Sequence, residues 1–355
     1  MKSNKMIKNS FFILFCGMCL YGQSQDTVKV KTALTPIQEA ENLYNQGLEY
    51  IGKKEHNMAI ENFTKAILLN PAFEKAFYGR GFAKFDSKNY EASIDDYNKA
   101  LALKPTYTDA LFGKAQSFYA LHKKDSCKTY LSRTTLIDET YSKAFYLNGQ
   151  LKFEDQMYKE AIVDYNGAIA AKADYAYAYN DRASAKKMLG DDMGAIADYE
   201  KAVSIDPKLY FSYNNLGSCK RNKGDNAGAI LAYNKAIAIK SDYYVAINNR
   251  GTAKLNSNDF AGAISDFDEA LKYKRDYALA MCNMASAYIK KKDYKVAVEW
   301  ANKAIQADAK MGVAFVNRGI AKLLLKDENG ACEDWKKAKE LGVSEGKSFS
   351  SGLCD

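Results

Sequence analysis

The sequence predicts an all-α fold built from about nine repeats of 34 residues. Apolar residues recur every three or four positions, alanine is frequent, and no stretch alternates as a strand would. The segment NNRGTAKL at 248–255 returns as VNRGIAKL at 316–323, two steps of 34 later. Small residues return at the same step throughout the chain: Ala59, Ser93, Cys127, Ala161, Ala195, Ala229, Ala263, Ala297 and Ala331.

The N-terminus has the layout of a secretory signal peptide. The first ten residues carry three lysines and no acid, and about a dozen mostly apolar residues follow. This run is too short to span a bilayer as a helix, and small or polar residues come directly after it. We therefore expect residues 1–22 to be a cleaved leader and 23–39 a linker, so that the protein is exported and lies in the periplasm or cell envelope. An uncleaved anchor is the alternative.

The charge balance does not indicate a nucleic-acid partner. The chain holds 51 basic and 43 acidic residues, and three of the basic ones lie in the leader. The remaining excess is mild and is spread along the chain, with no basic stripe. We expect a protein or peptide partner, with a membrane-associated complex as one setting.

Each repeat carries glycine or alanine at one place and usually an aromatic residue sixteen positions later. We count each unit from Ala40 and from every thirty-fourth residue after it, which gives nine units over 40–345 and a tail at 346–355. The eighth places are Gly47, Gly81, Ala115, Gly149, Ala183, Gly217, Gly251, Ala285 and Gly319. The twenty-fourth places are Phe63, Tyr97, Leu131, Tyr165, Tyr199, Tyr233, Phe267, Ala301 and Trp335. Small residues allow two helices to cross closely, and the aromatic ring fills the space beside them.

This pattern resembles the tetratricopeptide-repeat family, whose unit is a helix–turn–helix of 34 residues. The resemblance implies a right-handed α-solenoid whose first helices line a concave groove that binds protein or peptide. The third unit, 108–141, departs most from the pattern, with Cys127, Leu131 and Thr134 at its key places. We expect a kink or a soft spot there.

In four units an arginine at the seventh place is matched by an aspartate at the twenty-third. The arginines and their aspartates are Arg80 with Asp96, Arg182 with Asp198, Arg250 with Asp266, and Arg318 with Asp334. The unit with Leu216 at the seventh place has Ala232 at the twenty-third. We therefore predict structural ion pairs between the two helices of one unit. An exposed pair of this kind would contribute about 0.2–1 kcal/mol.

A row of asparagines runs along the first helices of the C-terminal half. Asn180, Asn214 and Asn248 occupy fifth places, and Asn215, Asn249, Asn283 and Asn317 occupy four consecutive sixth places, preceded in the series by Asp181. Asparagine is about 0.6–0.7 kcal/mol worse than alanine inside a helix, so the row needs a reason. Carboxamides can pair with the backbone of an extended peptide, which predicts a binding role. Copying by duplication, or bonding to a neighbouring unit, remains the alternative.

Aromatic residues occupy the fifth places of the first four units: Tyr44, Tyr78, Phe112 and Tyr146. Together with the asparagines they predict a groove that is aromatic in its N-terminal half and lined by amides in its C-terminal half. Aromatic rows at helical spacing also arise from packing alone.

The sequence shows no catalytic set, cofactor motif or metal-ligand spacing. Its two histidines have no acid–base partner pattern, and its glycines belong to the repeat. Cys332 and Cys354 are placed to form a disulfide that would hold the tail over the last helix, which an oxidising compartment permits.

The sequence thus predicts a non-enzymatic scaffold of a bacterial cell envelope that holds an extended segment of a partner in its groove. One alternative is an architectural subunit of an envelope complex that binds through its convex face. Another is a glycan-binding or regulatory subunit of an enzyme.

Overall fold

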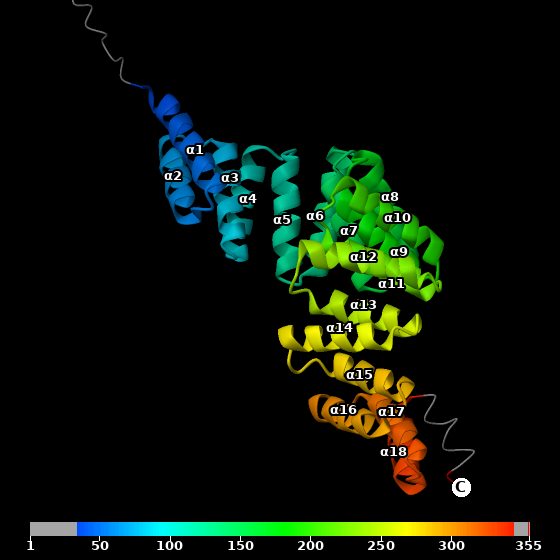
Figure 1. Ribbon diagram of the computed structural model, residues 1–355. Coiled ribbons are helices and arrows are strands. Elements are labelled where there is room, and N and C mark those ends of the chain that lie inside the picture. The colour runs from blue at the N-terminus through cyan, green and yellow to red at the C-terminus, as the bar shows by residue number, and fades with distance from the viewer. Residues whose placement is uncertain (1–33, 344–353, 355) are drawn as a thin grey trace, which may run out of the picture.

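The computed structural model, which describes residues 34–343 and 354, is a solenoid of eighteen α-helices with no strand in the described part (Figure 1). The first helices of the units are α1 (Pro36–Gly52), α3 (Glu74–Asp86), α5 (Thr108–Ala120), α7 (Ser142–Glu154), α9 (Ala176–Met188), α11 (Tyr210–Asn222), α13 (Tyr244–Asn256), α15 (Ala278–Lys290) and α17 (Gly312–Leu324). The second helices are α2 (His56–Leu69), α4 (Tyr90–Leu103), α6 (Lys124–Ile137), α8 (Tyr158–Ala171), α10 (Asp192–Ile205), α12 (Asn226–Ile239), α14 (Phe260–Tyr273), α16 (Tyr294–Ala307) and α18 (Glu328–Glu340). The predicted all-α repeat fold is confirmed, because each helix packs on its neighbours in chain order.

Both ends of the solenoid differ from the expected boundaries or lie outside the described residues. α1 begins at Pro36, inside the expected linker, because Thr35 and Gln38 form a capping box. The expected leader and most of the linker and tail lie outside the described part. No helix within that part is long and apolar enough to cross a membrane.

The two helices of a unit cross at the small residues that the sequence singled out. Phe63 and Tyr165 are fully buried between their helices. A Cβ atom added to Gly47 would lie 2.6 Å from the Phe63 ring, and one added to Gly149 would lie 2.6 Å from the Tyr165 ring. Glycine therefore allows the closest approach in these units, because a Cβ atom would displace the ring or the helices.

The second helices of most units begin at a side chain that caps the helix. Asp259 Oδ1 accepts a hydrogen bond of 2.9 Å from the backbone N–H of Gly262, and Asp191 and Asp225 do the same in their units. An acceptor at this place satisfies an otherwise free backbone donor and complements the helix dipole. In these units the cap therefore helps to fix the residue at which the second helix begins.

Each arginine of the seventh place links three helices. Arg250 on α13 donates to both carboxylate oxygens of Asp266 on α14, at 2.9 and 2.8 Å. Its Nη1 also donates to Asn234 Oδ1 on α12, the second helix of the preceding unit, at 2.9 Å. The other three arginines form the same clamp, Arg80 with Asp96 and Thr64, Arg182 with Asp198 and Asn166, and Arg318 with Asp334 and Asn302.

The clamps are more buried than the sequence analysis expected. The Asp266 side chain is only 4% exposed, and Lys254 lies 2.8 Å away as a second cation. The predicted ion pairs between the two helices of one unit are present, whereas the expectation that they are exposed is wrong. The reason is that the second helix of the preceding unit covers the pair and supplies a third partner.

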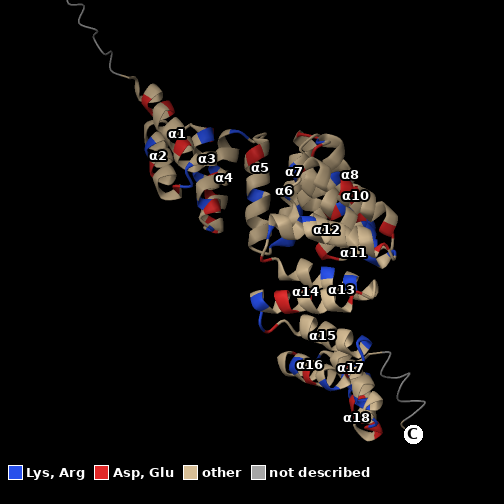
Figure 2. Ribbon diagram, in the orientation of Figure 1, with Lys and Arg blue, Asp and Glu red and all other residues tan. Residues whose placement is uncertain are grey.

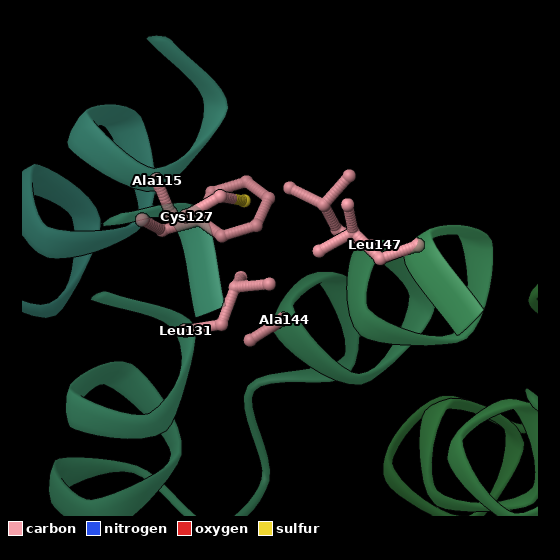
Figure 3. Packing of buried hydrophobic residues seen from close by; sticks show 7 residues of the cluster. Ala115, Cys127, Leu131, Ala144 and Leu147 are labelled. Atoms are coloured by element: carbon pink, nitrogen blue, oxygen red, sulfur yellow. The ribbon is translucent and has the colours of Figure 1, made fainter. Parts of the chain in front are cut away.

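The third unit joins the fourth less extensively than other units join their neighbours. α6 contacts α7 less than any other second helix contacts the helix that follows it. A cavity of about 240 Å³ lies there, lined by Leu131 and Thr135 of α6 and by Phe145 and Asn148 of α7. Figure 3 shows Leu131 and Cys127 of α6 near Ala144 and Leu147 of α7, where most other units have an aromatic ring in place of Leu131.

The C-terminal end is closed by a disulfide. Cys332 of α18 is bonded to Cys354 of the tail, with their Cα atoms 5.5 Å apart. The bond holds the tail to the terminal unit, which has no following repeat to pack against.

Removing one partner of a clamp should destabilise the solenoid strongly. We expect Asp266→Ala to lower the free energy of unfolding by about 3 kcal/mol, since it leaves Lys254 without a counterion and Arg250 with only the more exposed Glu269, 3.3 Å away. Urea unfolding followed by circular dichroism measures this. Asp268→Asn, which removes an exposed carboxylate near Lys272, is the matched control and should cost less than about 0.5 kcal/mol.

Replacing both clamp partners should restore much of the loss. Arg250→Leu combined with Asp266→Ala copies the natural Leu216 and Ala232 pair of the preceding unit. A double variant no more stable than Asp266→Ala alone would contradict this account of the clamp.

Breaking the disulfide should loosen the last unit alone. We expect Cys354→Ser to destabilise the terminal unit by about 3 kcal/mol, the size expected for a loop of this length. Hydrogen exchange should then quicken in α17 and α18 and stay unchanged in α1 to α4. Equal exchange in α18 with and without the bond would contradict the expectation.

Candidate functional site

Aromatic rings on the first helices of the N-terminal half pack against neighbouring aromatic rings with part of their surface. The Tyr78 ring lies 5.1 Å from that of Tyr107, and the Tyr146 ring lies 4.9 Å from that of Tyr175, centre to centre. Tyr44 and Phe112 pack in the same way on Phe73 and Tyr141. Tyr44, Tyr78 and Tyr146 keep part of their surface exposed, whereas Phe112 is buried. Packing thus fixes the rings along one side of the helices.

A pocket of about 310 Å³ opens among these rings, and we call it the aromatic pocket. Its lining comes mainly from three consecutive first helices, which places it on the groove side of the solenoid. The lining residues are Tyr78, Phe82, Tyr97, Asp109, Phe112, Gly113, Gln116, Tyr141, Lys143, Tyr146, Leu147, Gln150 and Tyr175. Such a mainly aromatic hollow with a few polar groups suits an apolar or aromatic side chain.

A second pocket of about 220 Å³ adjoins the first through Gln150, and we call it the acidic pocket. It is lined by Tyr119, Gln150, Phe153, Glu154, Tyr165, Asp181 and Ser184. The two pockets therefore lie next to each other over α3, α5, α7 and α9.

Asp181 is held in place by neutral hydrogen-bond donors. The Tyr146 hydroxyl donates to Oδ2 at 2.6 Å, and Asn180 Nδ2 donates to Oδ1 at 2.8 Å. Gln150 Nε2 in turn donates to the Tyr146 hydroxyl at 3.1 Å. Burial raises the pKa of the Asp181 carboxyl above its usual value, and the hydrogen bonds oppose this shift.

The asparagines form a ladder between neighbouring units. Asn249 Nδ2 donates to Asn214 Oδ1 at 2.9 Å, and Asn283 Nδ2 donates to Asn248 Oδ1 at 2.9 Å. Asn317 continues the ladder by donating to the backbone carbonyl of Cys282 at 3.1 Å. Each bond joins the sixth place of one unit to the fifth place of the unit before it.

Burial separates the two sets of asparagines. Asn180, Asn214 and Asn248 are 5%, 6% and 1% exposed, so they lie inside the interface between units. Their predicted role on the groove surface is wrong, because each amide is closed off by the next first helix. The sixth-place asparagines, including Asn215, keep part of their surface exposed. Bonding to a neighbouring unit, the alternative that the sequence left open, is the arrangement seen.

Some pocket residues were not predicted. Phe82, Gln116, Gln150 and Ser184 occupy the ninth place of their units. The sequence does hold a signal for them, because residues four apart on a helix share a face and the ninth places lie four after the fifth places already predicted to line the groove. Nothing in the repeat pattern indicates Glu154, which is specific to one unit.

The structure shows no sign of a metal centre in its described part. Within residues 34–343 and Cys354, no three His, Cys, Asp or Glu side chains lie together in a way that could hold a metal ion. Lys, Arg, Asp and Glu are interspersed along the helices, and no continuous stripe of one sign is visible in Figure 2.

Comparisons with solved structures support the fold. The chain is similar to a chain of the APC/C hetero-tetramer Cut9–Hcn1, with a TM-score of 0.56 and 14% identity over 90% of this chain and 77% of that one. It is also similar to pilF of Pseudomonas aeruginosa, with a TM-score of 0.51 and 18% identity over 60% of this chain and 98% of that one. A search of curated protein sequences found no match.

Family models give a more specific result. Models described as tetratricopeptide repeat match residues 40–73, 74–107, 176–209, 212–243 and 248–311. These ranges cover more than half of the chain and fit the register of the helix pairs described above. The chain therefore belongs to the tetratricopeptide-repeat family.

Proposed function

We propose that the protein is a non-enzymatic scaffold that holds an extended segment of a partner protein against α3, α5, α7 and α9. The observation that carries the proposal is the pair of adjoining pockets, aromatic and acidic, on consecutive first helices. Its first helices supply half-buried amides, Gln116 and Gln150, beside partly exposed rings. Amides of this kind can pair with a peptide backbone while the rings receive its side chains.

In this proposal, the first helices in the C-terminal half of the solenoid stabilise it and do not bind the partner. Amides that would otherwise pair with a peptide backbone are engaged with one another in the ladder. A buried amide cannot reach a partner without separating two units, which would leave polar groups unpaired. The ladder therefore holds the units in register, while the N-terminal half receives the partner.

We place the protein outside the cytoplasm, in a bacterial cell envelope. The leader-like layout of residues 1–22 supports this placement. The Cys332–Cys354 disulfide gives independent support, because such bonds persist in oxidising compartments.

A second candidate function is that of an architectural subunit that docks through its second helices. Large apolar side chains lie exposed there, with Leu68 of α2 75% exposed, Leu136 of α6 82% and Leu231 of α12 68%. These leucines stand on separate helices, which favours the groove over this surface as the primary site.

Site-specific photo-crosslinking distinguishes the two surfaces. A photoreactive residue in place of Gln116 should capture a partner in the envelope fraction. The same residue in place of Lys99, on the exposed side of α4, is the matched control and should capture little. Capture at Lys99 and none at Gln116 would overturn the groove proposal in favour of the outer surface.

The ladder should matter for stability and not for binding. We expect Asn283→Ala to lower the free energy of unfolding by about 1–2 kcal/mol, because the variant leaves the buried Asn248 amide without its partner. The variant should leave capture at Gln116 unchanged, and Asn256→Ala, at an exposed position on α13, serves as the control. Loss of capture at full stability would instead assign the ladder to binding.

A further inference from the structure

Asp181 differs from the other carboxylates buried in the solenoid. Asp266 and Asp198 each lie against one arginine and one lysine, and Asp164 lies 2.7 Å from Lys152. Within the described part of the chain, Asp181 has no lysine or arginine at ion-pair distance, and its partners Tyr146 and Asn180 are neutral. A partly buried carboxylate without a counterion is costly, and the cost falls when a cation approaches.

The same place in the following units is neutral. Asn215, Asn249, Asn283 and Asn317 stand where the fifth unit has Asp181. Three of them, Asn249, Asn283 and Asn317, bond the preceding unit without a charge, so the contact between units does not need a negative charge at this place. The charge is therefore available for a role toward a ligand.

The rest of the acidic pocket also favours a cation. A second carboxylate, Glu154, lines it, and accepts a hydrogen bond from Tyr119. Lys124 lies 3.4 Å from Glu154 but closer to Asp155, at 2.6 Å, and no basic residue lines the pocket itself. Two negative groups at one hollow give a local potential that attracts positive charge.

The walls suit the stem and head of a long basic side chain. Tyr119, Phe153 and Tyr165 supply aromatic surface, against which a methylene stem can pack. Aromatic faces also attract a guanidinium or ammonium group directly. The pocket volume of about 220 Å³ accommodates one such side chain.

We propose that the acidic pocket receives an arginine or lysine side chain of the bound partner segment, with Asp181 as its main counterion and Glu154 at the rim. The inference rests on the proposed function. Because Gln150 lines both pockets, they lie close enough for the same segment to place an apolar or aromatic residue in the aromatic pocket.

A random dodecapeptide phage library panned on the purified protein tests this directly. Enriched peptides should share a basic residue next to an apolar or aromatic one. Binding of a synthetic enriched peptide should weaken at least tenfold when its arginine is replaced by citrulline, or its lysine by norleucine, because the charge is lost and the shape is kept.

The protein variants give the complementary measurement. Asp181→Asn should weaken the same peptide at least tenfold and remove the difference between the charged and neutral peptides. It should fold, because asparagine occupies this place in the next four units, and thermal melting checks this. Glu160→Gln removes one exposed carboxylate of α8 outside both pockets and should leave binding unchanged.

The outcomes separate the inference from the proposed function. Enrichment of peptides without a basic residue, or equal binding by the wild type and Asp181→Asn, would overturn the inference and leave the groove function standing. Enrichment of no peptide at all would overturn both. If Asp181→Asn fails to fold, equal binding of the charged and neutral peptides to the wild type still overturns the inference.

Discussion

The close crossing of two helices at one small residue is the constraint on which the rest of the solenoid depends. In most units glycine is pressed against a buried ring, as Gly149 is against Tyr165, with no room for a Cβ atom. Because the crossing is the same in most units, the helices keep the same relative placement, and a residue at a given place meets equivalent neighbours each time. Contacts between residues sixteen and thirty-five positions apart therefore recur along the chain, so the same local interactions stabilise the whole solenoid.

Two kinds of polar contact join neighbouring units, the arginine clamp and the amide ladder, and they lie on different sides of the first helices. The arginine clamp reaches the second helices of its own and the preceding unit, as Arg250 does with Asp266 and Asn234. The amide ladder joins successive first helices. In the fourth unit Asn148 takes the arginine's place, so no arginine on α7 reaches back to α6. Together with the looser contact of α6 with α7, this makes the junction of the third and fourth units the least tightly joined in the described part of the chain, beside the acidic pocket.

The sequence alone predicts features that repeat every 34 residues and features whose paired residues lie in one unit. The helix pairs and the pairing of arginine with aspartate follow from such patterns. The burial of the pairs did not, because their third partner, such as Asn234, lies in the preceding unit and varies between threonine and asparagine. The bonds of the asparagine ladder join residues 35 positions apart, one position off the 34-residue repeat. The ladder is therefore not visible as a period in the sequence, and the sequence analysis places the asparagines in the groove. The pockets depend on side-chain gaps among several helices, which no single place in the repeat encodes.

The account predicts a division of labour in which the N-terminal half of the groove binds and the C-terminal half maintains the solenoid. Hydrogen exchange with and without a saturating bound peptide tests this most directly, since protection reports which helices a ligand stabilises. The account predicts new protection in α5, α7 and α9 and unchanged exchange in α13, α15 and α17. New protection confined to α13, α15 and α17, or to second helices alone, would contradict it.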